Sequence, residues 1–208
     1  SYEASYETYY MLGKLEEYTG STQRAIKAYE TALEISPQAH QCRLSLARAL
    51  CDLGSIHRAE TELARLRYEY RRSDVVWALS GRVFLAHSDT KRGLRALKKA
   101  IRINYRCSIA HTILGDYYSR HACKRSIKHY HLALDGDRPL YSLYDKLATL
   151  YQQLGRYDQA ISQLSLMKYF ATPEDQIKIQ KKIRELNHKL DNDNKLKRDS
   201  SWWQRLVG

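Results

Sequence analysis

The sequence predicts an all-α protein in which about five helix hairpins are stacked in a row and followed by one further helix. Three observations support this fold class. The 208 residues include only nine glycines and three prolines, too few for a loop-rich or disordered chain. Apolar residues recur with helical spacing. Small residues return at a period of 34, as Gly13, Ala47, Gly81 and Gly115, and Ala148 continues the series one residue short of the next full period.

The period divides residues 4–173 into five units, at about 4–37, 38–71, 72–105, 106–139 and 140–173. In the second helix of each unit another small residue recurs, as Ala25, Ala59, Gly93, Ser126 and Ala160. Small residues that face each other let two antiparallel helices approach closely, and a fixed period lets one hairpin stack on the next. A glycine closes the first helix at Gly20, Gly54 and Gly155. Because no hairpin buries its own apolar face, stacking recovers the lost packing volume.

These repeats resemble the tetratricopeptide repeat family, whose W-x2-L-G-x2-Y…A-x3-F…P pattern has the same period. Trp77 stands at the tryptophan position, and the closing proline is Pro37, Pro139 or Pro173 in three of the units. The third unit departs from the pattern, with Ser80 for the leucine and Gly93 for the alanine. The resemblance implies a right-handed α-solenoid whose first helices line a concave groove for an extended peptide or a partner helix.

After the array, Thr172-Pro173-Glu174-Asp175 has the residue types that start a helix. The stripe Ile179, Ile183, Leu186 and Leu190 predicts a helix over 174–190 that caps the last hairpin, with a short partner-binding coiled coil as the alternative. Residues 191–208 are expected to form a flexible basic tail. Trp202 and Trp203 are costly to leave in water, so we expect the tail to dock on its own solenoid or on a partner.

No catalytic motif, phosphate loop or paired metal-ligand spacing stands out, so we expect neither an enzyme nor a bound cofactor or metal. The four cysteines, Cys42, Cys51, Cys107 and Cys123, form no CxxC pair and predict reduced thiols in the cytoplasm, with the edge of a larger complex or a membrane as a further option. No apolar run is long enough to span a bilayer, and no signal peptide is visible.

One groove position can be followed at the repeat period through Lys14, Arg48 and Arg82, and then through Asp116 and Thr149. Successive hairpins would space the three cations by about 10 Å, which suits a partner segment with regularly placed acids. The alternative is that each cation is a solvated residue on an exposed helix face. Tyr10, Tyr18 and Tyr118 are the candidate aromatic contacts in the groove. Of the positions that form the family's chaperone-binding carboxylate clamp, only Lys14 carries a matching charge.

The net charge of +12 is unevenly distributed. Residues 1–37 carry three Lys/Arg and six Asp/Glu, a net charge of −3, whereas residues 72–105 carry eight and two, a net charge of +6. A basic stripe is therefore predicted, formed by Lys91, Arg95, Lys98, Arg102, Lys124 and Lys128, and the family resemblance implies that it faces the convex side. It could meet RNA, an anionic membrane or an acidic protein, or it could be a solvated face that keeps the protein soluble.

The function we predict from the sequence is a non-enzymatic adaptor that holds a protein partner, such as an acidic peptide or helix, in the groove of the repeats. The alternative is a basic scaffold that docks on RNA or on an anionic membrane surface through its convex face.

Overall fold

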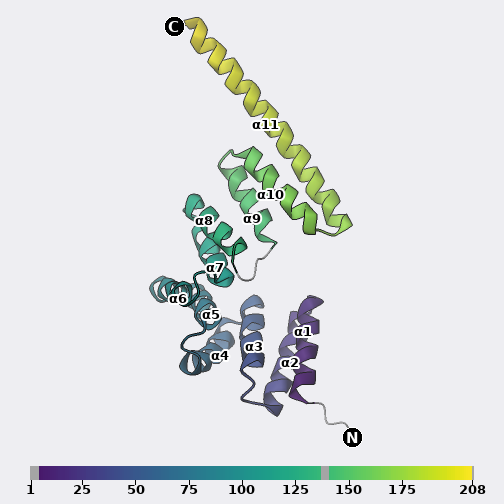
Figure 1. Ribbon diagram of the computed structural model, residues 1–208, viewed down its shortest axis with the longest axis vertical. Coiled ribbons are helices and arrows are strands. Elements are labelled where there is room, and N and C mark those ends of the chain that lie inside the picture. Colours follow the sequence, from purple (N-terminus) through teal and green to yellow (C-terminus); the bar gives the residue numbers. More distant parts are fainter. Residues whose placement is uncertain (1–4, 137–140, 208) are drawn as a thin grey trace. The chain divides into compact units, whose positions relative to one another are not determined.

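The computed structural model describes residues 5–136 and 141–207, with side chains described as far as Leu196 (Figure 1). Within these residues the chain forms eleven α-helices and no strand. The first ten helices form five successive pairs. We call the leading member of each pair the first helix and the other the second helix. The pairs are α1 (Tyr6–Tyr18) with α2 (Thr22–Ile35), α3 (His40–Asp52) with α4 (Ile56–Glu69), α5 (Asp74–Ala86) with α6 (Thr90–Ile103), α7 (Ser108–Tyr118) with α8 (Cys123–Leu134), and α9 (Leu143–Gln153) with α10 (Tyr157–Phe170). Helix α11 (Pro173–Val207) follows them.

The chain divides into two compact units near the middle of α7, at Leu114 and Gly115. Unit 1 contains α1 to α6 and the start of α7, and its core includes Tyr29, Leu50 and Leu63. Unit 2 contains the end of α7 and α8 to α11, and its core includes Leu147 and Leu164. Each core draws on several helices, because an amphipathic helix buries its apolar stripe only against its neighbours.

The glycines of the first and fourth pairs make room for an aromatic ring. A Cβ atom on Gly13 would overlap the ring of Tyr29, and a Cβ atom on Gly115 would overlap the ring of Tyr130. Both tyrosines are almost fully buried. The small residue of the first helix is therefore a socket for a large residue of the second helix, which is how these pairs retain their packing volume.

The third pair uses a different arrangement, which explains its departures from the repeat pattern. Gly81 and Gly93 lie against each other, and a Cβ atom on either would come within 2.7 Å of a leucine side chain. Ser80, at the leucine position, is fully buried; its hydroxyl donates to the Val76 carbonyl at 2.7 Å and accepts from the Arg67 guanidinium at 3.1 Å. A serine at this position therefore satisfies a partly buried arginine of the preceding hairpin.

Among the described residues, four first helices end at a residue with left-handed backbone. Gly20, Gly54 and Gly155 have φ angles of 80°, 80° and 67°, which confirms the expected glycine turns. Ser88 lies 34 residues after Gly54 and has a φ angle of 62°. An L-amino acid strains its backbone in this conformation, whereas glycine does not.

Helix α11 is longer than expected from the sequence. Its Ile179, Ile183 and Leu186 are buried in the core of unit 2, and Thr172 caps its start by accepting from the Asp175 amide at 3.3 Å. The helix does not stop at residue 190 but continues to Val207, so the expected boundary at residue 190 is not seen, while the flexibility of the tail stays a prediction. Residues 191–207 contain neither proline nor glycine to break the helix. The side chains of Trp202 and Trp203 lie outside the described residues, and their docking stays a prediction.

We predict that Ser88→Gly raises the free energy of unfolding by about 0.5–1 kcal/mol, because it relieves the left-handed strain at this position. Urea unfolding followed by circular dichroism measures the change. Gly54→Ala is the matched control, since no atom lies within 4 Å of an added Cβ there and only backbone strain is introduced. That variant should be destabilised, and a Ser88→Gly protein no more stable than the parent would contradict the prediction.

Candidate functional site

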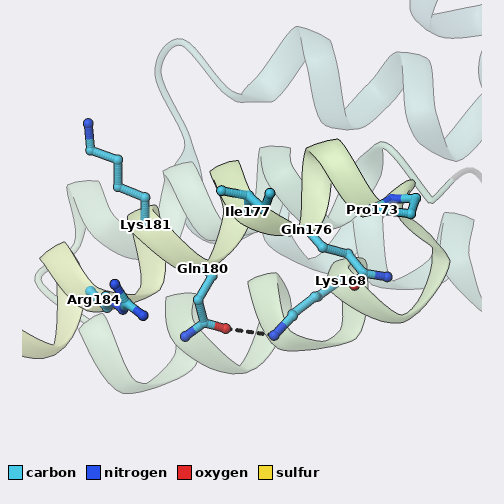
Figure 2. Close-up of a pocket in the computed structure, with 7 residues that line it drawn as sticks. All are labelled: Lys168, Pro173, Gln176, Ile177, Gln180, Lys181 and Arg184. Atoms are coloured by element: carbon cyan, nitrogen blue, oxygen red, sulfur yellow. Dashed lines mark hydrogen bonds between the residues drawn. The ribbon is translucent and has the colours of Figure 1, made fainter.

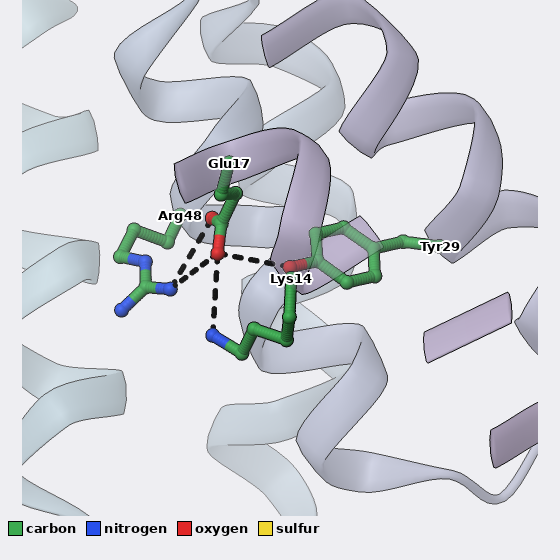
Figure 3. Close-up of polar contacts among 4 residues, drawn as sticks. All are labelled: Lys14, Glu17, Tyr29 and Arg48. Atoms are coloured by element: carbon green, nitrogen blue, oxygen red, sulfur yellow. Dashed lines mark hydrogen bonds and ion pairs between the residues drawn. The ribbon is translucent and has the colours of Figure 1, made fainter. Parts of the chain in front are cut away.

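Two of the three predicted groove cations meet at one carboxylate (Figure 3). Glu17 near the end of α1 accepts from the Lys14 ammonium at 3.2 Å and from the Arg48 guanidinium of α3 at 2.9 Å. The Tyr29 hydroxyl of α2 donates to the same carboxylate at 2.9 Å. Glu17 thus connects both helices of its own hairpin to the first helix of the next hairpin.

We call Lys14, Arg48 and Arg82 the ladder cations, or the ladder. The third of them is paired in the same way with the preceding hairpin. The Arg82 guanidinium of α5 donates to the Asp52 carboxylate at 2.6 Å and to the Cys51 carbonyl at 3.1 Å, both at the end of α3. Lys14, Arg48 and Arg82 therefore lie on successive first helices of unit 1, as predicted, but they do not form an uncompensated row of positive charge. Their assignment as partner contacts stays a prediction.

Unit 2 repeats this arrangement with different residues. Asp116 of α7 accepts from the Tyr130 hydroxyl at 2.7 Å and from the Lys146 ammonium of α9 at 2.5 Å. One hairpin later, Asp145 of α9 accepts from Lys182 of α11 at 2.9 Å. We call these contacts inter-hairpin ion pairs, meaning Glu17–Arg48, Asp52–Arg82, Asp116–Lys146 and Asp145–Lys182.

The buried tyrosines depend on these carboxylates to satisfy their hydroxyls. Burial, followed by the adjacent carboxylate, raises the pKa of Tyr29 and of Tyr130 far above the ordinary value. Both hydroxyls therefore stay protonated and act as donors. Glu17 and Asp52 were missed in the sequence, because they follow the ladder cations by three and four residues and so fall out of the 34-residue register.

The candidate aromatic contacts differ in exposure. Tyr10 is half-buried with its ring 5.9 Å from that of Tyr29, whereas Tyr18 at the end of α1 is 91% exposed. Tyr118 belongs to the second compact unit, where it stacks on His129 with ring centroids 5.6 Å apart. Of the three candidates, Tyr10 and Tyr18 therefore lie on the same hairpin as Lys14.

Helix α6 carries a second charged surface, which we call the α6 basic face. It consists of Lys91, Arg95, Lys98 and Arg102, which are all exposed and make no ion pair with any described residue. The other two cations of the helix differ, since Arg92 lies over the Phe84 ring and Lys99 over the Trp77 ring. Lys124 and Lys128 are exposed on α8 and belong to unit 2.

A third surface, which was not predicted from the sequence, is a groove of about 500 Å³ between α10 and α11 (Figure 2). We call it the α10–α11 groove. Its lining includes three cations and no carboxylate, and the Lys168 ammonium is held by the Gln180 side chain at 2.7 Å. The residues that line it are Lys168, Pro173, Gln176, Ile177, Gln180, Lys181 and Arg184.

The described residues place no three His, Cys, Asp or Glu side chains where they could hold a metal ion together. Burial raises the pKa of the Cys42 and Cys51 thiols to about 11, so at neutral pH these cysteines are unreactive packing residues. Of the described helices, none has a stretch long and apolar enough to cross a membrane.

Comparison with protein families finds two matching segments. Residues 19–83 match one family model described as a tetratricopeptide repeat, and residues 141–165 match another with the same description. Among curated protein sequences, none matches the chain.

Solved structures show the same fold. The thermophilic tetratricopeptide repeat protein TTC0263 of Thermus thermophilus aligns with a TM-score of 0.73 at 21% identity, over 88% of this chain and 98% of that one. The protein PilF of Pseudomonas aeruginosa aligns with a TM-score of 0.60 at 18% identity, over 93% and 90%. The Cut9–Hcn1 hetero-tetramer of the APC/C aligns with a TM-score of 0.70 at 13% identity, over 89% of this chain and 37% of that one.

We predict that Tyr29→Phe lowers the free energy of unfolding by about 1 kcal/mol at pH 7, because the hydroxyl loses a hydrogen bond to Glu17. The difference should shrink above pH 10. Since the pKa of Tyr29 is raised in the folded state, the unfolded chain loses this proton first as the pH rises. The free energy of unfolding of the parent then falls by about 1.4 kcal/mol per pH unit relative to that of the variant, which lacks this proton.

Chemical unfolding from pH 8 to pH 11 measures this dependence. Tyr18→Phe is the control, since this exposed hydroxyl should change neither the stability nor its pH profile. A gap between parent and Tyr29→Phe that stays constant through pH 11 would contradict the assignment.

Proposed function

Because this chain is a tetratricopeptide repeat protein, we propose that it is a non-enzymatic adaptor that holds a segment of a partner protein against the first helices of unit 1. Proteins with this fold and these repeats are in general interaction modules rather than enzymes. The partner we propose is a peptide or helix with regularly placed acidic residues, bound within a multi-protein assembly.

The observation that carries the proposal is the regular placement of half-exposed cations on consecutive first helices. The side chains of Lys14, Arg48 and Arg82 are 35%, 34% and 38% exposed. Each cation is already paired with a neighbouring carboxylate, so a carboxylate of the partner would compete for it. Exposed ion pairs contribute only about 0–1 kcal/mol each, so a partner carboxylate can compete with Glu17 or Asp52 at small cost.

Apolar area near the ladder supports the same surface. Tyr10 and Leu44 are half-buried residues of α1 and α3 that pack on the core and leave part of their side chains accessible. Contact with such area would supply most of the affinity, while the cations set the register of the bound segment.

The α6 basic face supports a second candidate function, that of a scaffold on RNA or on an anionic membrane. Its four cations form no ion pair with a described residue, and the helix contains no acidic residue to offset them. It also has no exposed aromatic residue between the cations on which a base could stack. Any nucleic acid bound there would be held through phosphates alone, with strong dependence on salt.

The test of the adaptor function is capture of partners from the source cell with the full chain as bait, at low and high salt and with nuclease. We expect a protein partner that survives nuclease. Changing Lys14, Arg48 and Arg82 together to Glu should weaken its binding by about tenfold or more. Glu17→Gln should strengthen binding, because it frees Lys14 and Arg48 for the partner.

The matched control is Lys146→Glu, which breaks the equivalent inter-hairpin ion pair in unit 2 and should leave partner binding unchanged. Circular dichroism and urea unfolding establish that each variant is folded. Binding that is unaffected by the triple change and by Glu17→Gln would show that the ladder is not the contact surface.

A separate prediction concerns the α6 basic face. Changing Lys91, Arg95, Lys98 and Arg102 to Glu should leave capture of the protein partner intact if the adaptor function is correct. Loss of all partners after nuclease, or only with this second variant, would instead assign the function to the α6 basic face and identify RNA or an anionic surface as its target.

A further inference from the structure

Helix α1 presents an apolar surface that no described residue covers. Met11, Leu12 and Leu15 are 63%, 43% and 59% exposed, and Tyr18 at the end of the same stripe is almost fully exposed. These residues are spaced so that they share one side of the helix. We call them the α1 stripe. Large apolar side chains grouped in this way usually mark a contact surface.

The same repeat positions are buried in the next two hairpins. Met11, Leu12 and Leu15 correspond to Ser45, Leu46 and Ala49 of α3, all of which are at most 7% exposed. They correspond to Leu79, Ser80 and Val83 of α5, which are at most 1% exposed. In α3 and α5 these positions belong to the packed core of unit 1, where neighbouring hairpins meet. The α1 stripe therefore has the position of a stacking surface and fits another helical surface better than an extended peptide.

Acidic residues border the α1 stripe. Glu7 and Glu16 lie on its two edges by helical geometry, and neither forms an ion pair with any described residue. The surface that covers α1 must therefore be apolar at its centre and positively charged at its rim. A second copy of α1 does not meet this condition, because Lys14, the one cation of the helix, is already paired with Glu17, and the two acidic rims would repel each other.

The α10–α11 groove meets it (Figure 2). Ile177 on its wall is 74% exposed, and Tyr169, which lines a neighbouring pocket that shares Lys168 and two glutamines with the groove, is 89% exposed. Lys181 and Arg184 border the groove without forming an ion pair to a described residue. Among the described side chains, Lys168 is bound only to the neutral Gln180 amide. The groove thus offers apolar area and three cations that no described carboxylate offsets.

The two surfaces also match in length. The α1 stripe runs from Met11 to Tyr18, about 11 Å of helix, or about 17 Å when its edge residue Glu7 is included. The groove wall on α11, from Pro173 to Arg184, extends for about 17 Å by the same rise per residue. A helix can therefore lie along the groove with its apolar stripe over Ile177 and its acids beside the cations.

We propose that α1 of one molecule docks in the α10–α11 groove of a second copy, in a head-to-tail contact. The contact is heterologous, so a dimer keeps one free α1 stripe and one free groove and can add further copies. One helix in a shallow groove buries less area than a standard stable interface, so the association is weak and concentration-dependent. The contact uses neither the ladder cations Arg48 and Arg82 nor the α6 basic face.

The test is sedimentation of the full chain over a range of concentrations, with two single variants. Leu15→Glu places a charge in the stripe and Ile177→Glu places one in the groove; both sites are exposed, so both variants should keep the parent's circular dichroism. The parent should form oligomers that grow with concentration, and each variant alone should be a monomer.

Mixing the two variants provides the decisive measurement. Ile177→Glu retains an intact stripe and Leu15→Glu retains an intact groove, so an equimolar mixture should form a 1:1 dimer that cannot grow further. Leu196→Glu is the matched control, because it places the same charge on an exposed residue of α11 outside the groove and should associate like the parent. High salt should weaken the parent's oligomers by screening the acidic and basic rims.

A parent that remains monomeric at the highest concentration would overturn the proposal. So would a mixture of the two variants that stays monomeric. Dimers that persist in Ile177→Glu but vanish in Leu15→Glu would show that α1 pairs with itself, and they would overturn it as well.

Discussion

The arrangement of the hairpins depends on a carboxylate at or near the end of a first helix that binds a cation of the next hairpin. Glu17 holds Arg48, and Asp116 holds Lys146, while each carboxylate also accepts from the tyrosine that fills its own hairpin's glycine socket. In these two hairpins one acidic side chain therefore contacts both helices of its own hairpin and the first helix of the following hairpin.

The period, the turns and the apolar stripe of α11 could be predicted from the sequence because they rest on local spacing. The inter-hairpin ion pairs could not, because Glu17 and Arg48 are 31 residues apart and the acids occupy shifted positions in successive repeats. Ser88 was missed because a left-handed serine has no compositional signal. The end of α11 was misjudged because polarity suggested disorder where the chain contains nothing that breaks a helix.

The charged surfaces are of two kinds: in one the cations are paired with neighbouring carboxylates, and in the other they are not. This distinction changes how the net charge of +12 should be interpreted. The cations of the first helices are balanced locally, so they position a partner rather than attract it over long distances. The α6 basic face and the α10–α11 groove lack such balance and account for the long-range field of their helices. Formal charge alone does not separate these roles, since Arg48 and Arg95 look alike in the sequence.

The most direct test of the role given to the carboxylates is a double-mutant cycle between Glu17 and Arg48, with Glu17→Gln, Arg48→Met and the double variant compared in urea unfolding. We predict a favourable coupling of about 0.5–1 kcal/mol, carried across the boundary between two hairpins. A coupling of zero would mean that the two residues lie together without linking the hairpins, and the role assigned to the carboxylates would then be wrong.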